Sequence, residues 1–202
     1  MLESEKFTPA ARINLERLTV LLIDDNQQAL DMLAQVVSGF GVRQIIKCEN
    51  ADMARQVVSK HPLDMAIVDA HLAGQGGYQF IEWLRREAGP PNAYIPAIIV
   101  TGHSRRAEVL RARDCGANFL VAKPITPKVL LDRIFWIAKD ERIFIETATY
   151  VGPDRRFKRE GPPPGTKGRR ADDRPPTIGE ASTPNLSQDQ INDMFKPSKV
   201  KI

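Results

Sequence analysis

Short apolar runs that alternate with helical patterns constrain the fold of this chain most strongly. The runs are rich in Val and Ile and apolar on both faces, as strands of a buried parallel sheet must be. They occupy residues 18–23, 43–48, 64–69, 97–101 and 119–123. The segments between and after them have a periodicity of about 3.6 residues, which is typical of amphipathic helices. Five strands alternating with five helices predict an α/β doubly wound fold, with helices on both faces of a parallel sheet.

Residues that favour helix starts precede several of these segments. Asn26 and Asn50 stand where N-caps belong, and Thr126 precedes Pro127 at the first helical position, where a missing N–H costs nothing. In the helix after Asn50 the periodicity places Met53 on the inward face together with neighbouring apolar residues.

The distribution of charge and proline divides the chain. The net charge is +4, yet the first 150 residues carry equal numbers of acidic and basic side chains, and more than half of the 15 prolines follow residue 150. We therefore expect a compact domain followed by a tail. The predicted units are an N-terminal extension (1–17), a compact domain (18–139), an apolar bridge (140–151), a Pro/Gly/basic linker (152–184), a short amphipathic helix (185–197) and a basic end (198–202).

Composition also disfavours two classes of protein. Apolar runs stay well below the roughly 20 residues of a membrane-spanning helix, and the start, MLESEKFTPA, lacks the apolar stretch of a signal peptide. Cys48 and Cys115 are far apart and outside metal-type spacing, which favours two reduced thiols packed as small apolar residues. We expect a cytoplasmic protein without a membrane partner.

Chemically useful side chains gather at the carboxyl ends of the predicted strands, where open α/β sheets bind ligands. Two adjacent carboxylates are costly unless a cation lies between them. A divalent cation such as Mg²⁺, a hydroxyl and an amine can together neutralise a phosphoryl group, so this set predicts phosphoryl transfer to a carboxylate. The set is Asp24, Asp25, Asp69, Thr101 and Lys123.

Four motifs, in this order and spacing, resemble the receiver domains of bacterial two-component response regulators, of which the chemotaxis regulator is the simplest member. They are LLIDDN, AIVDAHLAGQGG, IIVTGHS and VAKPIT, and the resemblance covers about residues 18–139. It implies a flavodoxin-like sheet with strand order 2-1-3-4-5. It also implies phosphorylation by a histidine kinase or a phosphotransfer protein, with Mg²⁺ as the cofactor.

The resemblance assigns a role to each site residue. Asp69 would be the phosphoacceptor and Thr101 would bind a phosphoryl oxygen, while Lys123 would pair with the phosphoryl group and precede a cis bond to Pro124. The implied metal ligands are Asp25, Asp69 and the backbone carbonyl of His71, with Asp24 acting mostly through water.

Two departures from the family pattern concern the switch and the loop after the acceptor. Family members often have Tyr or Phe three residues before the lysine, whereas this chain has Leu120 there and Phe119 one place earlier. Leu72 and Ala73 replace a common Met-Pro pair, and Gly77 is expected to supply the conformational freedom of the loop.

His71 and His103 lie two residues beyond Asp69 and Thr101. In the family, these two places flank the path of the attacking water. Because an imidazole titrates near neutral pH, dephosphorylation is expected to vary between about pH 6 and 8. The alternative is that both are ordinary loop histidines without kinetic weight.

The fifth predicted helix carries an apolar stripe wider than one sheet face would cover. Receivers commonly use the face of the fourth helix, fifth strand and fifth helix for output, and the stripe agrees with that use. Alternatively, residues 142–151 fold back over it. The stripe consists of Leu130, Leu131, Ile134, Phe135 and Ile137.

The tail segment NLSQDQINDMFKP has the marks of a self-contained helix. Ser187 and Gln190 form a capping box, Leu186 and Ile191 a hydrophobic staple, and Pro197 ends the helix. Such a short helix needs a docking partner to be stable. The segment resembles the amino-terminal peptide of the flagellar switch protein, which docks on the chemotaxis regulator, so it is either an internal ligand or a helix recognised by another protein. Its apolar contact residues would be Leu186, Ile191, Met194 and Phe195.

These features favour a stand-alone phosphorylation switch that signals through protein contacts. The alternative is a regulator whose basic segment, residues 154–174, binds nucleic acid; its interleaved acids and single aromatic residue favour a solvated linker instead. An output enzyme is disfavoured because the tail offers no catalytic constellation and no room for a second core.

Overall fold

The computed structural model describes residues 14–140, 142–155 and 186–195. Five parallel strands form one sheet in the order β2-β1-β3-β4-β5. The predicted α/β fold class and strand order are therefore confirmed. The strands are β1 (Thr19–Ile23), β2 (Gln44–Cys48), β3 (Met65–Asp69), β4 (Ala97–Thr101) and β5 (Phe119–Ala122).

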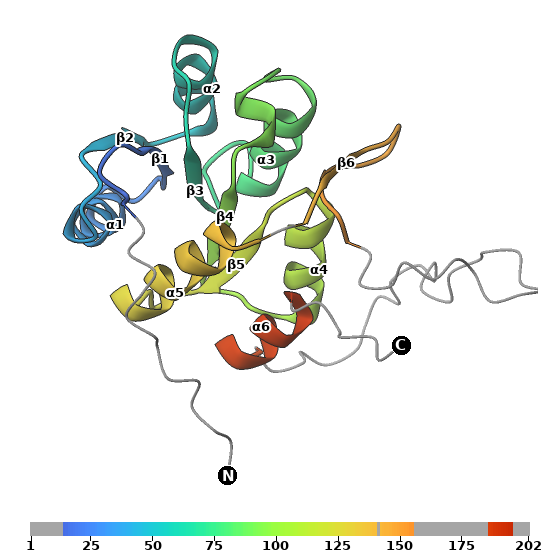
Figure 1. Cartoon of the computed structure of the whole chain (residues 1–202). Coiled ribbons are helices and arrows are strands. Elements are labelled where there is room, and N and C mark those ends of the chain that lie inside the picture. Colours follow the sequence, from blue (N-terminus) through green and yellow to red (C-terminus); the bar gives the residue numbers. More distant parts are fainter. Residues whose placement is uncertain (1–13, 141, 156–185, 196–202) are drawn as a thin grey trace, which may run out of the picture.

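Helices cover both faces of this sheet (Figure 1). α1 and α5 lie on one side of the sheet, and α2, α3 and α4 lie on the other. The elements are α1 (Gln27–Gly39), α2 (Ala51–Lys60), α3 (Gly77–Arg86), the 3₁₀ turn η1 (Asn92–Tyr94), α4 (Arg106–Asp114) and α5 (Pro127–Ala138).

Burial follows the place of each strand in the sheet. Every residue of β3 and β4 is buried, as both strands are covered on both faces and flanked by neighbours. β2, at one edge, leaves Gln44 and Lys47 exposed. Complete burial thus marks two inner strands of the sheet.

The predicted helix starts are confirmed. Asn26 accepts hydrogen bonds from the N–H groups of the first turn of α1, Asn50 accepts one from Met53 N, and Thr126 accepts one from Val129 N. The inward placement of Met53 is wrong, because the residue is 45% exposed. The buried face of α2 runs instead through Ala51, Ala54 and Val58.

Arg85 on α3 is a buried cation that joins three segments. Its guanidinium donates to the carbonyl oxygens of Gly116, Ala93 and Ile95 and to Asn118 Oδ1. Burial lowers the pKa of Arg85 to about 10. These hydrogen bonds fix η1 and the turn before β5 against α3.

Residues after α5 form a two-stranded hairpin, β6 (Phe144–Glu146) with β7 (Val151–Pro153). The hairpin contacts α3 and η1: Arg86 donates to Thr149 O, and the Phe144 ring packs edge-on against Tyr94. It thus packs mainly away from the apolar stripe of α5, although the Arg142 guanidinium lies over the ring of Trp136. The stripe itself is buried at Leu130, Ile134 and Ile137 and half-buried at Leu131 and Phe135.

The tail forms the predicted helix, α6 (Gln188–Phe195), which lies against β5 beside α4 and α5 (Figure 1). Its capping box is confirmed: Ser187 N donates to Gln190 Oε1, and Gln190 N donates to Ser187 Oγ. Ile191 is fully buried, and Leu186 and Met194 pack against the core. The side chain of Phe195 lies outside the described residues, as do residues 1–13 of the predicted extension, residues 156–184 of the linker and the basic end.

Cys48 and Cys115 are free and buried, as expected. Burial raises the pKa of Cys48 to about 11 and that of Cys115 to about 12, so both remain thiols at neutral pH. Nowhere in the described ranges is a helix both long and apolar enough to cross a membrane.

Candidate functional site

Four of the predicted site residues meet at the carboxyl edge of the sheet. Asp24 follows β1, Asp69 and Thr101 end β3 and β4, and Lys123 follows β5. Asp24, Asp69 and Thr101 are buried, while Lys123 is half-buried. Parallel pairing places these strand ends side by side, which explains why residues far apart in the sequence converge.

The ammonium group of Lys123 joins the two buried carboxylates. Lys123 Nζ lies 2.7 Å from Asp69 Oδ1 and 3.0 Å from Asp24 Oδ2. Burial alone would lower the pKa of Lys123, but the hydrogen bonds and charges of Asp69 and Asp24 outweigh it and raise the pKa. The lysine therefore remains charged at neutral pH and offsets part of the negative charge of the two acids.

Backbone N–H groups hold the other oxygens of these acids. Asn26 N donates to Asp24 Oδ1 at 2.9 Å, and His71 N donates to Asp69 Oδ2 at 2.6 Å. Asp69 is thus held from both sides, which orients its carboxylate at the open edge of the sheet.

Asp25 differs from the other two acids. Its side chain is exposed, and Asp25 Oδ2 accepts a hydrogen bond from Ala73 N at 2.9 Å. The sequence reasoning did not assign Ala73 any role. The replacement of the family's common proline by Ala73 was the sequence feature that could have revealed this hydrogen bond, because proline has no N–H to donate.

Thr101 and the two predicted histidines form the rim of the site. The Thr101 hydroxyl donates to His103 O at 3.2 Å and accepts from His103 N at 3.1 Å. The rings of His71 and His103 meet edge-on with their centroids 5.2 Å apart. The structure therefore places both imidazoles together beside the ends of β3 and β4.

Leu120 is fully buried in β5 at the place where relatives often carry an aromatic ring. Phe119 packs against Trp136 of α5. Because neighbouring residues of a strand face opposite sides of the sheet, Phe119 does not stand in for an aromatic ring at Leu120.

Gly77 has a different role from the predicted one. A Cβ atom at this position would lie 1.9 Å from Asp69 O, so the residue permits the close approach of α3 to the end of β3. Conformational freedom is needed instead at Gly74, where φ is +81°. The bond between Lys123 and Pro124 is cis, as expected.

The donor set is compatible with a hard divalent cation. Within the described ranges, no three His, Cys, Asp or Glu side chains are placed to hold a metal ion together. The carboxylate of Asp25 instead accepts a hydrogen bond from Ala73 N. Asp24 and Asp69 share one ammonium group and so stand close together. Mg²⁺ commonly uses one or two carboxylates and completes its sphere with water and phosphate oxygens, so these residues fit it.

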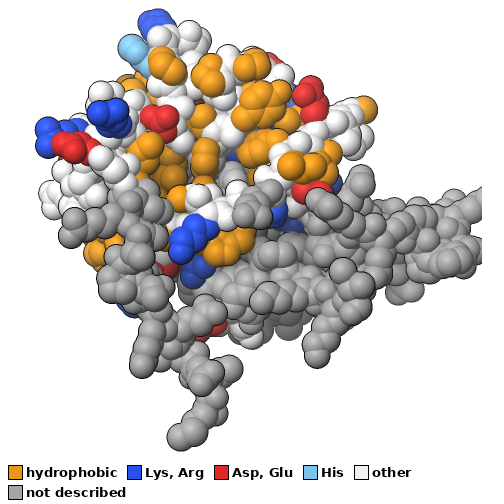
Figure 2. Space-filling model, viewed as in Figure 1, with side chains coloured by type: hydrophobic (Ala, Val, Ile, Leu, Met, Phe, Trp, Pro, Cys, Tyr) orange, Lys and Arg blue, Asp and Glu red, His pale blue; other side chains and the backbone are white. Residues whose placement is uncertain are grey.

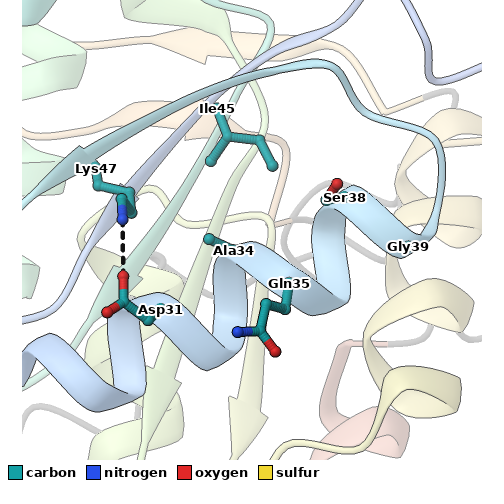
Figure 3. A pocket seen from close by; sticks show the side chains of 7 residues that line it. All are labelled: Asp31, Ala34, Gln35, Ser38, Gly39, Ile45 and Lys47. Atoms are coloured by element: carbon teal, nitrogen blue, oxygen red, sulfur yellow. Dashed lines mark hydrogen bonds and ion pairs between the residues drawn. The ribbon is translucent and has the colours of Figure 1, made fainter.

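A separate groove of about 650 Å³ lies between α1 and β2 (Figure 3). It is lined by Ile45 and by the ion pair of Lys47 and Asp31, whose atoms are 2.7 Å apart. None of the residues that converge at the sheet edge lines it, so we do not assign it to the site.

The geometry defines an α/β domain with a buried acceptor carboxylate, a paired lysine and a neighbouring hydroxyl at one sheet edge. The sequence matches the family of response regulator receiver domains over residues 20–135. The chain therefore belongs to the receiver domain family of response regulators, whose members take part in phosphorylation-based signalling.

Relatives and solved structures agree with this assignment. A probable chemotaxis protein CheY of Rhizobium etli is 27% identical, and the match covers 61% of this chain and 97% of that protein. The transcriptional regulatory protein GltR of Pseudomonas aeruginosa is 31% identical over 57% of this chain, but the match covers 47% of GltR. Against this and other transcriptional regulators the chain spans about half of the relative's length.

Among solved structures, a putative response regulator from Chloroflexus aurantiacus is 27% identical with a TM-score of 0.57, covering 61% of this chain and 98% of that one. The receiver domain of the histidine kinase CKI1 from Arabidopsis thaliana, solved with Mg²⁺ and BeF₃⁻, is 20% identical with a TM-score of 0.56; the match covers 62% of this chain and 93% of that one and supports the fold alone.

Proposed function

We propose that this chain is a cytoplasmic bacterial response regulator that accepts a phosphoryl group on Asp69 and signals through protein contacts. The supporting observation is the pairing of Lys123 with two buried carboxylates beside Thr101. A cation, a hydroxyl and an acceptor oxygen are thus gathered where an incoming phosphoryl group would need them.

In the proposed reaction an oxygen of Asp69 attacks the phosphorus of a phosphohistidine or an acyl phosphate. A new P–O bond forms as the bond to the leaving group breaks, and the electron pair departs with that group. Lys123 would then exchange its contact with Asp69 for one with a phosphoryl oxygen, and the Thr101 hydroxyl would turn from His103 toward another.

We propose Mg²⁺ as the cofactor, held by Asp69, the backbone carbonyl of His71 and, after release from Ala73, Asp25, with Asp24 acting mostly through water. It would supply charge neutralisation to the phosphoryl oxygens. The CKI1 receiver, solved with Mg²⁺ and BeF₃⁻, has the same fold, which supports this choice.

The proposed partners are a histidine kinase or a phosphotransfer protein upstream and a protein target downstream, which would bind the face of α4, β5 and α5. We assign the chain no catalytic output beyond its own phosphorylation and dephosphorylation. The match to nearly the whole length of the CheY relative supports signalling through contacts of the receiver domain itself.

A regulator whose basic tail binds nucleic acid is the second candidate, because several relatives are transcriptional regulatory proteins. The basic residues from 156 onward lie outside the described part of the chain. On the face seen in Figure 2 the described hydrophobic side chains gather across the middle, and acidic and basic side chains are scattered around them. Retention on immobilised DNA that weakens with salt would favour this second candidate.

The test is phosphorylation of the full chain by acetyl phosphate, followed on a phosphate-affinity gel. We expect a base-labile phosphoprotein that forms with Mg²⁺ and fails to form with a chelator or in Asp69→Asn. Asp64→Asn is the matched control, because this acid precedes β3 at the opposite end and should leave the yield unchanged. A phosphoprotein of unchanged yield in Asp69→Asn would contradict the proposal.

A further inference from the structure

The free edge of β5 is occupied by one side chain of α6. Gln188 Oε1 accepts a hydrogen bond from Ala122 N at 2.8 Å, and Gln188 Nε2 donates to Leu120 O at 3.2 Å. In a parallel sheet the backbone groups of alternate residues form hydrogen bonds with opposite neighbouring strands. The backbone N–H and C=O groups of residues 120 and 122 therefore point away from β4. The amide of Gln188 thus takes the place that one peptide unit of a further strand would have.

A second pair of hydrogen bonds fixes the start of the tail helix to the loop between β4 and α4. Leu186 N donates to Ser104 O at 2.9 Å, and Ser104 Oγ donates to Leu186 O at 2.6 Å. Gln188 Nε2 also donates to Asn192 Oδ1 at 3.0 Å, which holds the glutamine in its rotamer. The start of the segment is therefore held by directional contacts at Leu186 and at Gln188.

Apolar contacts also hold α6 against the domain. Ile191 is fully buried and joins the main core, while Leu186 and Met194 pack against it. Burial lowers the pKa of Arg133 on α5, and the negative charges of Asp132 and Asp189 partly oppose this shift. The surface therefore fits an amphipathic helix that opens with Leu-Ser-Gln and carries an acid next to the glutamine.

These contacts are made by residues next to the proposed phosphorylation machinery. Ala122 immediately precedes Lys123, and Lys123 N donates to Thr101 O at 2.7 Å. Ser104 follows Thr101 by three residues in the same loop. If Lys123 and Thr101 move toward a phosphoryl group, the two places that hold α6 must move as well.

We propose that the edge formed by Ser104, Leu120 and Ala122 is a docking site for an amphipathic helix, that residues 186–195 of the same chain are its occupant, and that phosphorylation of Asp69 weakens the docking. The last part rests on the proposed function. Ala122, which donates to Gln188, immediately precedes Lys123, which contacts Asp69, so a movement of Lys123 toward a phosphoryl group would draw Ala122 away from Gln188. Because such coupling is reciprocal, undocking α6 should favour phosphorylation.

The amide of Ala122 provides a specific measurement, because Gln188 is its hydrogen-bond acceptor whereas the neighbouring Lys123 amide bonds inside the sheet. We expect amide hydrogen exchange of the full chain to show protection at both. In Gln188→Ala, exchange at Ala122 should become about tenfold faster or more, while Lys123 stays protected. Gln35→Ala, an exposed glutamine of α1, is the matched control and should change neither amide.

Adding beryllofluoride with Mg²⁺ to the full chain tests the coupling. We expect faster exchange at Ala122, and an affinity for beryllofluoride about threefold or more higher in Gln188→Ala than in the control variant. If beryllofluoride shifts the resonances of Asp69 and Thr101 but leaves exchange at Ala122 unchanged, the coupling is refuted. If it does not bind at all, the proposed function fails while the docking site stands.

Two further outcomes would overturn the assignment of the occupant. Equal exchange at Ala122 in the unmodified chain and in Gln188→Ala would show that α6 does not occupy the edge. Protection that increases with protein concentration would show that the helix comes from a second copy.

Discussion

Removing the ammonium group of Lys123 tests how the site keeps two buried carboxylates together. The Asp24 and Asp69 side chains are 6% and 7% exposed, and each contacts Lys123 Nζ. In Lys123→Met both carboxylates would remain at the sheet edge without their shared cation. We therefore expect the variant to fold with a lower free energy of unfolding.

The size of the loss follows from burial. Removing one partner of a fully buried ion pair costs about 3–5 kcal/mol, whereas an exposed pair contributes about 0–1 kcal/mol. The Lys123 side chain is 33% exposed, so an intermediate loss of about 2 kcal/mol is expected. Because the pKa of Lys123 is raised, its contribution is complete at neutral pH and is lost only as the pH rises through that pKa.

The assay is urea unfolding at neutral pH with a chelator present, followed by tryptophan fluorescence. Lys128→Met is the matched control: its ammonium group lies 3.3 Å from Asp132, but its side chain is 84% exposed. We expect a change of less than about 0.5 kcal/mol in the control. Equal losses in the two variants would refute the electrostatic explanation.

The same substitution should strengthen binding of Mg²⁺, because the ammonium group and a divalent cation are attracted to the same carboxylates. We expect about a tenfold lower dissociation constant in Lys123→Met, equivalent to about 1.4 kcal/mol. Added Mg²⁺ would then restore more stability to the variant than to the unmodified chain. Unchanged affinity would mean that the lysine and the cation do not compete.

Three other predictions concern neighbouring features. Ala73→Pro removes the N–H that holds the Asp25 carboxylate, so it should strengthen Mg²⁺ binding about two- to fivefold in calorimetric titration. Unchanged affinity would show that this hydrogen bond does not restrain the carboxylate. Gly77→Ala places a Cβ atom against Asp69 O and should lower the free energy of unfolding in urea by about 2 kcal/mol or more. In the control Gly39→Ala the added Cβ would meet no atom within 4 Å, so the free energy of unfolding should rise by about 0.5–1 kcal/mol. Burial raises the pKa of the Cys48 thiol to about 11 and that of the Cys115 thiol to about 12. Between about pH 9 and 10 these thiols therefore ionise in the unfolded chain but not in the folded one. The free energy of unfolding should fall over this range, by up to about 1.4 kcal/mol for each thiol and each pH unit. Replacing both cysteines by alanine should remove this slope.

Local patterns predicted the frame of the molecule because each acts over a few residues. The apolar runs mark the five strands, and Asn26, Asn50 and Thr126 cap the helices as expected, since side-chain capping needs only neighbouring N–H groups. The capping box at Ser187 was found in the same way. Met53 was misplaced because periodicity alone does not fix how far round a helix the buried face extends.

Contacts between distant segments were not predictable from such patterns. The hydrogen bond from Ala73 to Asp25 and that from Ala122 to Gln188 join residues from different loops and elements, and short polar side chains and backbone N–H groups leave no periodic trace. Gly77 was recognised as important for the wrong reason, because the clash with Asp69 O depends on how closely α3 approaches β3. Chemistry at the strand ends was predictable because parallel topology brings those ends together.

The two edge strands of the sheet are protected from pairing with another chain in different ways. An exposed strand edge is a template on which another chain can add a strand and begin to aggregate. β2 carries the exposed Lys47, a charge built into the strand itself. β5 relies on Gln188, which belongs to a helix far along the chain. When that helix leaves, the edge of β5 opens, so release of the tail would make self-association through strand addition possible at one end of the sheet and not at the other.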